Sequence, residues 1–247
     1  MNKFNFLSLV AVICMASVFL SCKKEKEKEP GSSPVISINA NVENISSISS
    51  KIDAVKAVVD PYWDFDEEIG PILTGGIPVA SSSYTNRLSL DLPNNVSSII
   101  NLEYMFDDPP NGVKVSNKDV KGTTAFLLGY ESESEIGLFL FVKPDNKGMI
   151  IVFADLVYVD SDVIITGSST EKEGSKTYIE KFNVSLKTGW NYMFSSEEVS
   201  TDGKTITYNY TTTYPGGLKW YFIDYEFEVE STSAIKSKMS SGFKRLK

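Results

Sequence analysis

Three consecutive segments decide the fold: IGLFLFV at residues 136–142, KPDNKG at 143–148 and MIIVFADLVYV at 149–159. The two outer segments are dense in β-branched and aromatic residues, which favour strands over helices. The middle segment holds Pro, Asp, Asn and Gly, the residues that tight turns prefer. The sequence therefore predicts two central strands joined as a β-hairpin.

Apolar and polar residues alternate on both sides of this hairpin. A period of two residues indicates strands with one buried face and one solvated face. Such strands are expected at residues 36–42, 51–59, 77–80, 87–92, 205–211 and 225–230. Because no segment shows a long 3.6-residue period, we expect an all-β protein with antiparallel β-sandwich architecture.

The spacing of these strands divides the body of the chain near residue 115. We expect residues 35–114 to form an N-terminal β-sandwich-like unit, packed against a C-terminal β unit at residues 115–233. One larger sandwich or barrel fits the same spacing. Residues 234–247 form a basic tail that carries no acid, and a frayed terminus is the expected state of such a tail.

The first 34 residues have the parts of an export leader. A positive start at Lys3 precedes an apolar run at residues 7–20, and Ser21 and Cys22 close the run. The apolar run is shorter than the roughly 17 to 25 residues that a spanning helix needs. We therefore expect a signal peptide at residues 1–21, followed at 22–34 by an acylated Cys22 and a charged, flexible tether. An ordinary signal peptide with an incidental cysteine is the alternative.

Two resemblances support this interpretation. The segment Phe19-Leu20-Ser21-Cys22 resembles a bacterial lipobox, with Phe19 in place of the usual aliphatic residue. Segments at residues 115–120, 157–163, 184–191 and 211–222 are similar to those of uncharacterised lipoproteins of Bacteroidota. The resemblance implies cleavage before Cys22, acylation of the new terminus and an all-β domain in the cell envelope, at the outer membrane and facing either the periplasm or the surface. It implies no activity and no catalytic residues.

Two residue types that enzymes often use are scarce. The 247-residue chain contains no histidine, and its two cysteines are Cys14, inside the leader, and Cys22. This removes the usual general base, the usual zinc ligand and a free thiolate nucleophile from the expected domain. A net charge of −8 also argues against a nucleic-acid partner. We expect a non-catalytic protein with no catalytic residues and no resident metal.

The sharpest local feature is the segment DPYWDFDEE from Asp60 to Glu68, which interleaves five carboxylates with three aromatic residues. Carboxylate oxygens bind calcium, and exposed aromatic rings stack on sugars. Trp63, Phe65, Asp64 and Asp66 are therefore predicted ligand-binding residues, and Ca²⁺ is the cofactor that this loop would take. An ordinary solvated loop is the alternative, since the spacing does not match an EF-hand.

A second group of aromatic residues lies near the C-terminus. We expect most of them, including Trp190, Phe194 and Trp220, to pack in the core, whereas Tyr214 and Tyr221 are predicted ligand-binding residues.

These features lead to three functional hypotheses. The leading one is a lipid-anchored, non-catalytic envelope protein, fastened to the membrane through its lipid, that binds a glycan or a surface protein. One alternative is a carboxylate-dependent glycoside hydrolase, in which the acids at 107–108 or at 160 and 162 would join Glu67 or Glu68 across a cleft. The other is a structural subunit of a surface assembly, which would offer an unpaired strand edge or groove.

Overall fold

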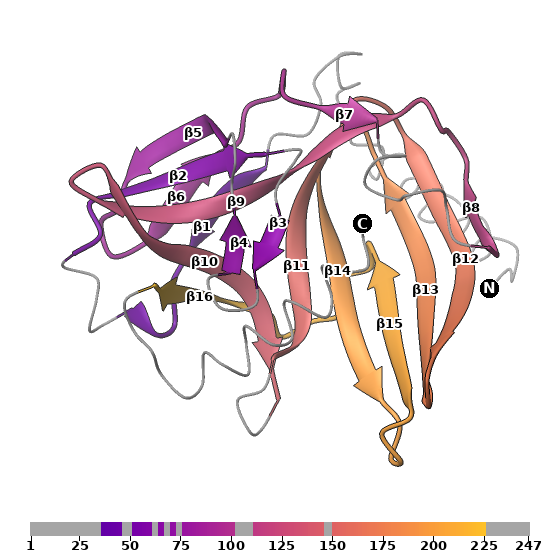
Figure 1. The fold of residues 1–247 in the computed structure, drawn as a ribbon. Helices are drawn as coiled ribbons and strands as arrows, with labels where there is room; N and C mark the ends of the chain where they lie inside the picture. Colours follow the sequence, from indigo (N-terminus) through magenta and orange to yellow (C-terminus); the bar gives the residue numbers. More distant parts are fainter. Residues whose placement is uncertain are drawn as a thin grey trace, which may run out of the picture. The chain divides into compact units, whose positions relative to one another are not determined.

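The computed structural model describes residues 36–45, 51–60, 64–66, 70–72, 76–101, 111–145 and 150–225. These residues form strands and the turns between them, with no α-helix in the described ranges (Figure 1). The predicted all-β sandwich class is confirmed. The expected leader, tether and basic tail lie outside these ranges, as does all but Tyr225 of the strand expected at 225–230. Within the described part of the chain, no helix has the length and apolar character to cross a membrane.

The strands follow one another along the chain as β1 (Ser37–Ala40), β2 (Ala54–Val59), β3 (Asp64–Asp66), β4 (Gly70–Ile72), β5 (Ile77–Ser83), β6 (Leu88–Asp91), β7 (Ile100–Asn101), β8 (Val113–Val115), β9 (Lys121–Glu131), β10 (Ser134–Pro144), β11 (Ile150–Val159), β12 (Val163–Glu173), β13 (Lys176–Leu186), β14 (Gly189–Val199), β15 (Thr205–Thr211) and β16 (Lys219–Asp224). The predicted central hairpin is confirmed, because β10 and β11 pair antiparallel with Pro144 opposite Ile150.

A 12-stranded sheet dominates the fold. Its main path runs β5-β2-β9-β10-β11-β14-β15-β13-β12-β8, while β16 pairs with β10 and β7 pairs with β9. Its neighbours are antiparallel except for the parallel pair β13–β15. Two-stranded sheets β1–β6 and β3–β4 complete the described fold. The large sheet runs across residue 114, because β2 pairs with β9 along Ala54–Val59.

The small sheet β1–β6 covers one face of the large sheet. Just after β1, Val42 forms a parallel bridge with Trp220 of β16, and the Glu43 N–H donates to the Trp220 carbonyl at 2.9 Å. The side chain of Asn44 then bonds the backbone of Phe222 twice, donating to its carbonyl at 2.6 Å and accepting from its N–H at 2.8 Å. These contacts join β1 to β16, so that β5, β2, β9, β10, β16, β1 and β6 curl around one core.

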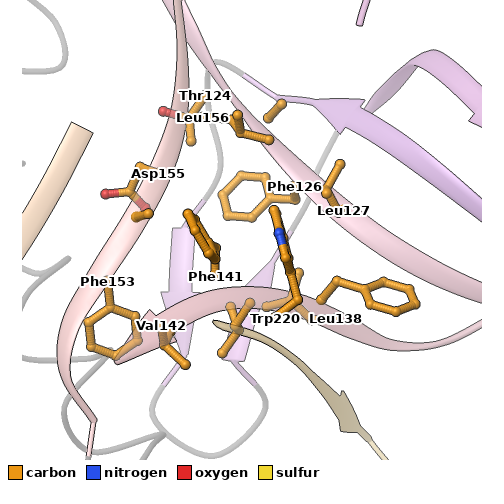
Figure 2. Close-up of a pocket in the computed structure, with 14 residues that line it drawn as sticks. Thr124, Phe126, Leu127, Leu138, Phe141, Val142, Phe153, Asp155, Leu156 and Trp220 are labelled. Carbon is orange, nitrogen blue, oxygen red and sulfur yellow. The ribbon is translucent and has the colours of Figure 1, made fainter. Parts of the chain in front are cut away.

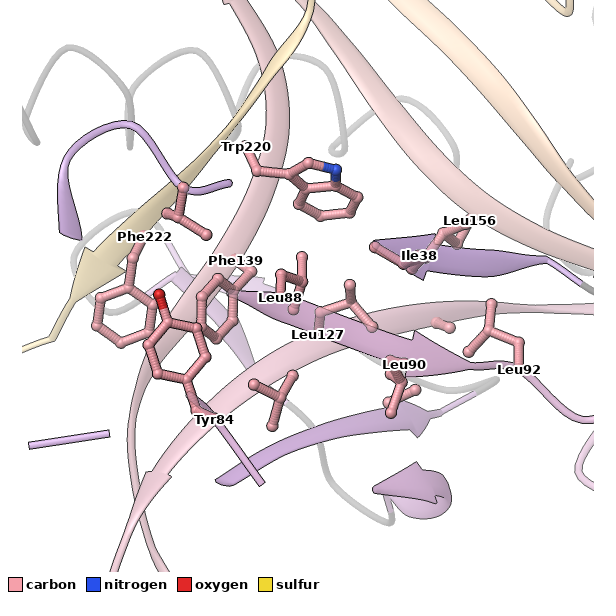
Figure 3. Close-up of a cluster of buried hydrophobic side chains, with 14 of the residues drawn as sticks. Ile38, Tyr84, Leu88, Leu90, Leu92, Leu127, Phe139, Leu156, Trp220 and Phe222 are labelled. Atoms are coloured by element: carbon pink, nitrogen blue, oxygen red, sulfur yellow. The ribbon is translucent and has the colours of Figure 1, made fainter. Parts of the chain in front are cut away.

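That core contains side chains from every one of these strands except β5, whose Val79 and Ala80 pack against its edge. Figure 3 shows Leu88 and Leu90 of β6 facing Leu127 of β9, with the rings of Phe139 and Phe222 beside them. The Phe139 and Phe222 ring centroids are 4.8 Å apart. Since Ile38 and Trp190 belong to the same cluster, residues from both expected units share this core.

A second core lies on the face of the large sheet formed by β11 to β15. Along β12 the side chains of Val163 and Ile165 are buried, whereas Ile164 between them is 51% exposed. This alternation is what a strand with one solvated face requires. The rings of Phe182 and Tyr210 stack there with centroids 4.8 Å apart.

Candidate functional site

The main candidate site is the gap between β5 and β6, which we call the seam and define by residues 79–82 and 89–94. The two strands are joined by the turn at residues 84–87, where Asn86 has a φ of 63°. The Arg87 guanidinium fixes this turn by donating to the side chains of Asn39 and Asn41. Beyond the turn, β5 pairs with β2 and β6 pairs with β1, so the two strands diverge instead of forming a ladder.

Both strands turn a backbone edge toward the seam that pairs with no other strand among the described residues. The Tyr84 N–H donates to the Asp53 carbonyl, so the backbone of Tyr84 points toward β2. Backbone groups alternate in direction along a strand, and those of Ser81 and Ser83 therefore point away from β2. On β6 the Leu92 N–H donates to the Ile36 carbonyl. By the same alternation, the backbone groups of Ser89 and Asp91 point away from β1 and toward β5.

The seam forms an open groove of about 560 Å³. Its floor comes from the inward side chains of Ala80 and Ser82 on β5 and from Leu90 and Leu92 on the other side, and the two leucines are at most 4% exposed. At the narrow end the Ser82 hydroxyl donates to the Ser89 carbonyl at 2.5 Å. Outward side chains of small polar residues form the rim.

The wide end of the seam is held open by the large sheet. The indole Nε1 of Trp190 on β14 donates to the Pro93 carbonyl at 2.8 Å, and the Tyr158 hydroxyl on β11 donates to the Asn94 carbonyl at 3.3 Å. The rings of Tyr158 and Trp190 meet edge to face with centroids 5.4 Å apart. The chain after β6 is therefore fixed to β11 and β14 and is drawn away from β5.

Apart from Asp91, the residues that line the seam are small, apolar or weakly polar. None of the described residues that line it is aromatic, and Asp91 is the one carboxylate among them. The Asp91 carboxylate accepts a hydrogen bond from the Ser37 hydroxyl across the β1–β6 ladder. A groove with backbone edges, an apolar floor and small side chains suits an extended chain better than a sugar ring, which binds by stacking.

A second, much smaller cavity lies where β9, β10 and β11 separate (Figure 2). β11 changes partner at this point, since Ala154 pairs with Phe141 of β10 and Leu156 pairs with Ala125 of β9. The cavity measures about 40 Å³, and the ring of Trp220 stacks on Phe141 beside it at 4.9 Å. This space holds about one water molecule, so it is too small for an organic ligand.

Asp155 sits at this point of partner exchange and lines the small cavity. Ala154 and Leu156 face the side of the sheet that holds Phe141 and Trp220, so strand alternation turns the Asp155 side chain to the opposite face. Burial raises the pKa of the Asp155 carboxyl to about 7.

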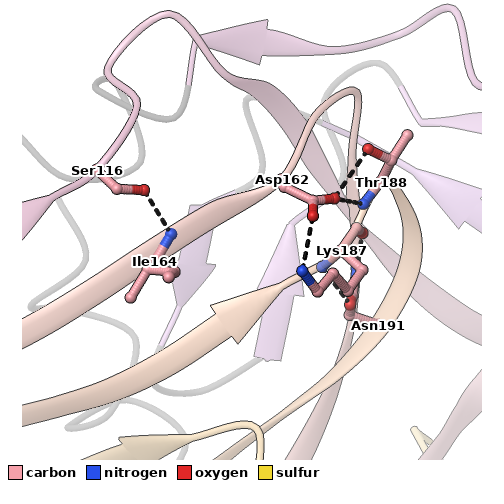
Figure 4. Close-up of polar contacts among 6 residues, drawn as sticks. All are labelled: Ser116, Asp162, Ile164, Lys187, Thr188 and Asn191. Carbon is pink, nitrogen blue, oxygen red and sulfur yellow. Dashed lines mark hydrogen bonds and ion pairs between the residues drawn. The ribbon is translucent and has the colours of Figure 1, made fainter.

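The predicted acid pair Asp160 and Asp162 belongs to the turns at one end of the sheet. Figure 4 shows Asp162 receiving hydrogen bonds from the Lys187 Nζ at 2.7 Å and the Thr188 N–H at 2.9 Å. These hydrogen bonds lower the pKa of the Asp162 carboxyl to about 2, and the bond from Lys187 has the largest effect. The Asp160 carboxylate accepts from the Lys121 N–H at 3.0 Å. Both acids therefore hold turns together, as turn chemistry predicts.

The predicted ligand-binding residues do not gather at one place. Cys22 and Trp63 lie outside the described residues, and the backbone of Asp64, Phe65 and Asp66 forms β3, which pairs with Gly70–Ile72 of β4. The segment was expected to be a loop, and the structure corrects that expectation for residues 64–66, whose backbone pairs with residues 70–72.

The two predicted tyrosines lie in different surroundings. Tyr214 is 56% exposed and rests edge to face on Phe194, with centroids 5.7 Å apart. Tyr221 is half-buried on β16, opposite Leu140. The predicted core positions of Trp190, Phe194 and Trp220 are confirmed, since each is at most 7% exposed.

Within the described ranges, no three potential ligand side chains gather in a way that could hold a metal ion. No motif in the sequence marks the seam. Its one signal is the run of small residues Ala80-Ser81-Ser82-Ser83, which lets another backbone approach.

Comparison of the chain with protein-family models, with curated proteins and with solved structures found no match.

Proposed function

We propose that this chain is a lipid-anchored, non-catalytic protein of the cell envelope that binds a surface protein in the seam between β5 and β6. The observation that carries the proposal is the pair of strand edges, both without a strand partner among the described residues, on the two sides of a groove of about 560 Å³. This volume falls within the range of roughly 300 to 1,000 Å³ in which binding sites are found.

Two alternatives have less support. A glycan site would rest on the exposed ring of Tyr214, since stacking needs an aromatic face and the described lining of the seam has none. A glycoside hydrolase needs two carboxylates flanking one bond, whereas Asp91 lines the seam alone among its described residues. A structural subunit of an assembly would use the same edges, with a second copy of the chain as the partner.

The proposed lipid anchor would place this binding site at a membrane. A multiply acylated Cys22 would hold the protein at a membrane, because each buried methylene contributes about 0.8 kcal/mol. Cells grown with a clickable palmitate analogue should label the native chain, and Cys22→Ser should abolish the label and release the protein from the membrane fraction. Equal labelling of the variant would contradict the anchor.

Site-specific photo-cross-linking in living cells tests the binding site. A photoreactive residue at Ser81, on the rim of the seam, should give a defined cross-linked protein band, while the same residue at Ile164, on the exposed face of β12, should not. Ala80→Trp, which fills the floor, should remove the band. A band of equal strength from Ile164, or one that survives Ala80→Trp, would refute the seam as the site. A band with the mass of two copies of this chain would identify a self-assembling subunit.

A further inference from the structure

We infer that the seam takes its partner as an added β-strand, paired through the backbone with both β5 and β6; this inference rests on the proposed function. The partner segment would be short, extended and neutral or basic, with small apolar side chains at alternate positions.

The first argument is the direction of the backbone groups. Ser81 on one side of the seam and Ser89 and Asp91 on the other present N–H and C=O groups toward the same gap. The Ser89 carbonyl is already bound by the Ser82 hydroxyl at the narrow end. The remaining groups can be paired by one strand that enters from the wide end, and an open edge is what strand addition uses.

The second argument is that the gap is held in place before binding. The bond from Ser82 to Ser89 fixes the narrow end, and the bonds from Trp190 to Pro93 and from Tyr158 to Asn94 fix the wide end. A preformed groove lowers the ordering cost of binding. The seam is therefore a built site whose width is set by β11 and β14, elements outside the seam itself.

The third argument concerns the side chains of the guest. Every second residue of an added strand would face the floor formed by Ala80, Ser82, Leu90 and Leu92, in which the Ser82 hydroxyl is already bound to the Ser89 carbonyl and the other three side chains are apolar. Small aliphatic side chains fit such a floor. The outward residues would lie beside Asp91, the one charged group among the described lining residues, in a chain of net charge −8. Charge complementarity therefore favours lysine or arginine at outward positions.

The geometry also fixes the type of pairing. β5 and β6 run in opposite directions because a single turn at residues 84–87 joins them. An added strand must be antiparallel to one of them and parallel to the other. Its two ladders would then differ in hydrogen-bond spacing.

A displayed library of eight-residue segments, panned against the full chain in detergent, tests the proposed chemistry. We expect enriched sequences to alternate small aliphatic residues with lysine or arginine. The best of them, made as a blocked peptide, should bind the native chain, and N-methylation of its alternate amides should abolish binding because it removes the ladder donors.

Two variants of one residue separate backbone pairing from side-chain contact. Ser81→Pro removes an edge N–H that points into the seam and spares the ladder to β2, whereas Ser81→Ala keeps the N–H and removes the hydroxyl. We expect Ser81→Pro to weaken the peptide by at least about fivefold, the effect of one lost hydrogen bond, and Ser81→Ala to leave the affinity within about twofold. Circular dichroism checks that both variants fold.

The outcomes also distinguish the two proposals. If photo-cross-linking places a partner at Ser81 but the N-methylated peptide binds as well as the unmodified one, strand addition is refuted and the seam remains the binding site. Enrichment of acidic or aromatic sequences would refute the proposed partner chemistry. If neither the library nor the cross-linker yields binding that depends on the seam, both proposals fail.

Discussion

Asp155 places a carboxylate inside one of the most apolar segments of the chain. The residue lies on β11 between Ala154, which pairs with β10, and Leu156, which pairs with β9. Burial raises its pKa to about 7, well above the ordinary value near 3.9 that an unfolded chain would show. The folded state therefore binds this proton more tightly than the unfolded state across that pH interval.

The sign of the effect on stability follows from this difference. Because the folded pKa is raised, the penalty for burying the charge is absent below about pH 4, grows between about pH 4 and pH 7, and is complete above pH 7. Asp155→Asn removes the charge and should raise the free energy of unfolding at pH 8 by about 1 to 3 kcal/mol. Urea denaturation of the wild-type protein and the variant at pH 4 and pH 8 measures this change in the free energy of unfolding.

The control for this prediction is Asp119→Asn, which changes an exposed carboxylate in the turn before β9 and should leave stability within about 0.5 kcal/mol at either pH. An Asp155→Asn variant that gains as much stability at pH 4 as at pH 8 would contradict the proposed cause.

The burial of single residues was predictable to different degrees. The core positions of Trp190 and Trp220 followed from their place in alternating, aromatic-rich strands, and both are buried. The environment of Asp155 could not be predicted, because it depends on β9 and β10 separating beside it. Asp160 and Asp162 were predictable as turn residues from the preference of aspartate for turns, although their partners, Lys121 for Asp160 and Lys187 and Thr188 for Asp162, lie far away in the sequence.

At the scale of elements, one side chain links the two layers. Asn44 donates to and accepts from the backbone of Phe222, and so extends the bridge that Val42 forms with Trp220 of β16. Asn44→Ala would leave both backbone groups of Phe222 without this partner in a part-buried position. We expect a loss of about 1 to 3 kcal/mol in the free energy of unfolding.

Thermal and urea denaturation of the variant give this value, with Asn183→Ala on the exposed face of β13 as the matched control. The control should change stability by no more than about 0.5 kcal/mol. Equal stability of the two variants would show that the link through Asn44 is dispensable.

Local pairing was predictable and distant pairing was not. The β10–β11 hairpin forms between neighbours in sequence, so periodicity and turn residues suffice to predict it. The seam arises because β5 pairs with β2 and β6 pairs with β1, although the same turn joins β5 to β6. A single sequence does not show which distant strands will pair, and the small residues that line the gap are the one indication of the seam that it contains.

At the scale of the whole molecule, the large sheet makes residues 36–225 interdependent. β2 pairs with β9 across the boundary expected near residue 115, and the main core draws side chains from both sides of it. Removing one side would expose the apolar surface of the other, which favours cooperative unfolding.

We therefore expect a single unfolding transition. Far-ultraviolet circular dichroism in a urea titration should give the same midpoint as hydrogen exchange of amides in β2 and in β13, which lie far apart in the strand order. Two separated midpoints, with β13 unfolding independently of β2, would contradict this expectation.

The hydrogen bond from Trp190 to the Pro93 carbonyl gives the protein a built-in optical reporter. Trp190 is 2% exposed, and its indole donates directly to a residue that lines the seam. Any guest that displaces Pro93 would alter the polarity around the indole and shift its fluorescence emission. Occupancy could thus be read from the unlabelled protein, with no dye or tag attached.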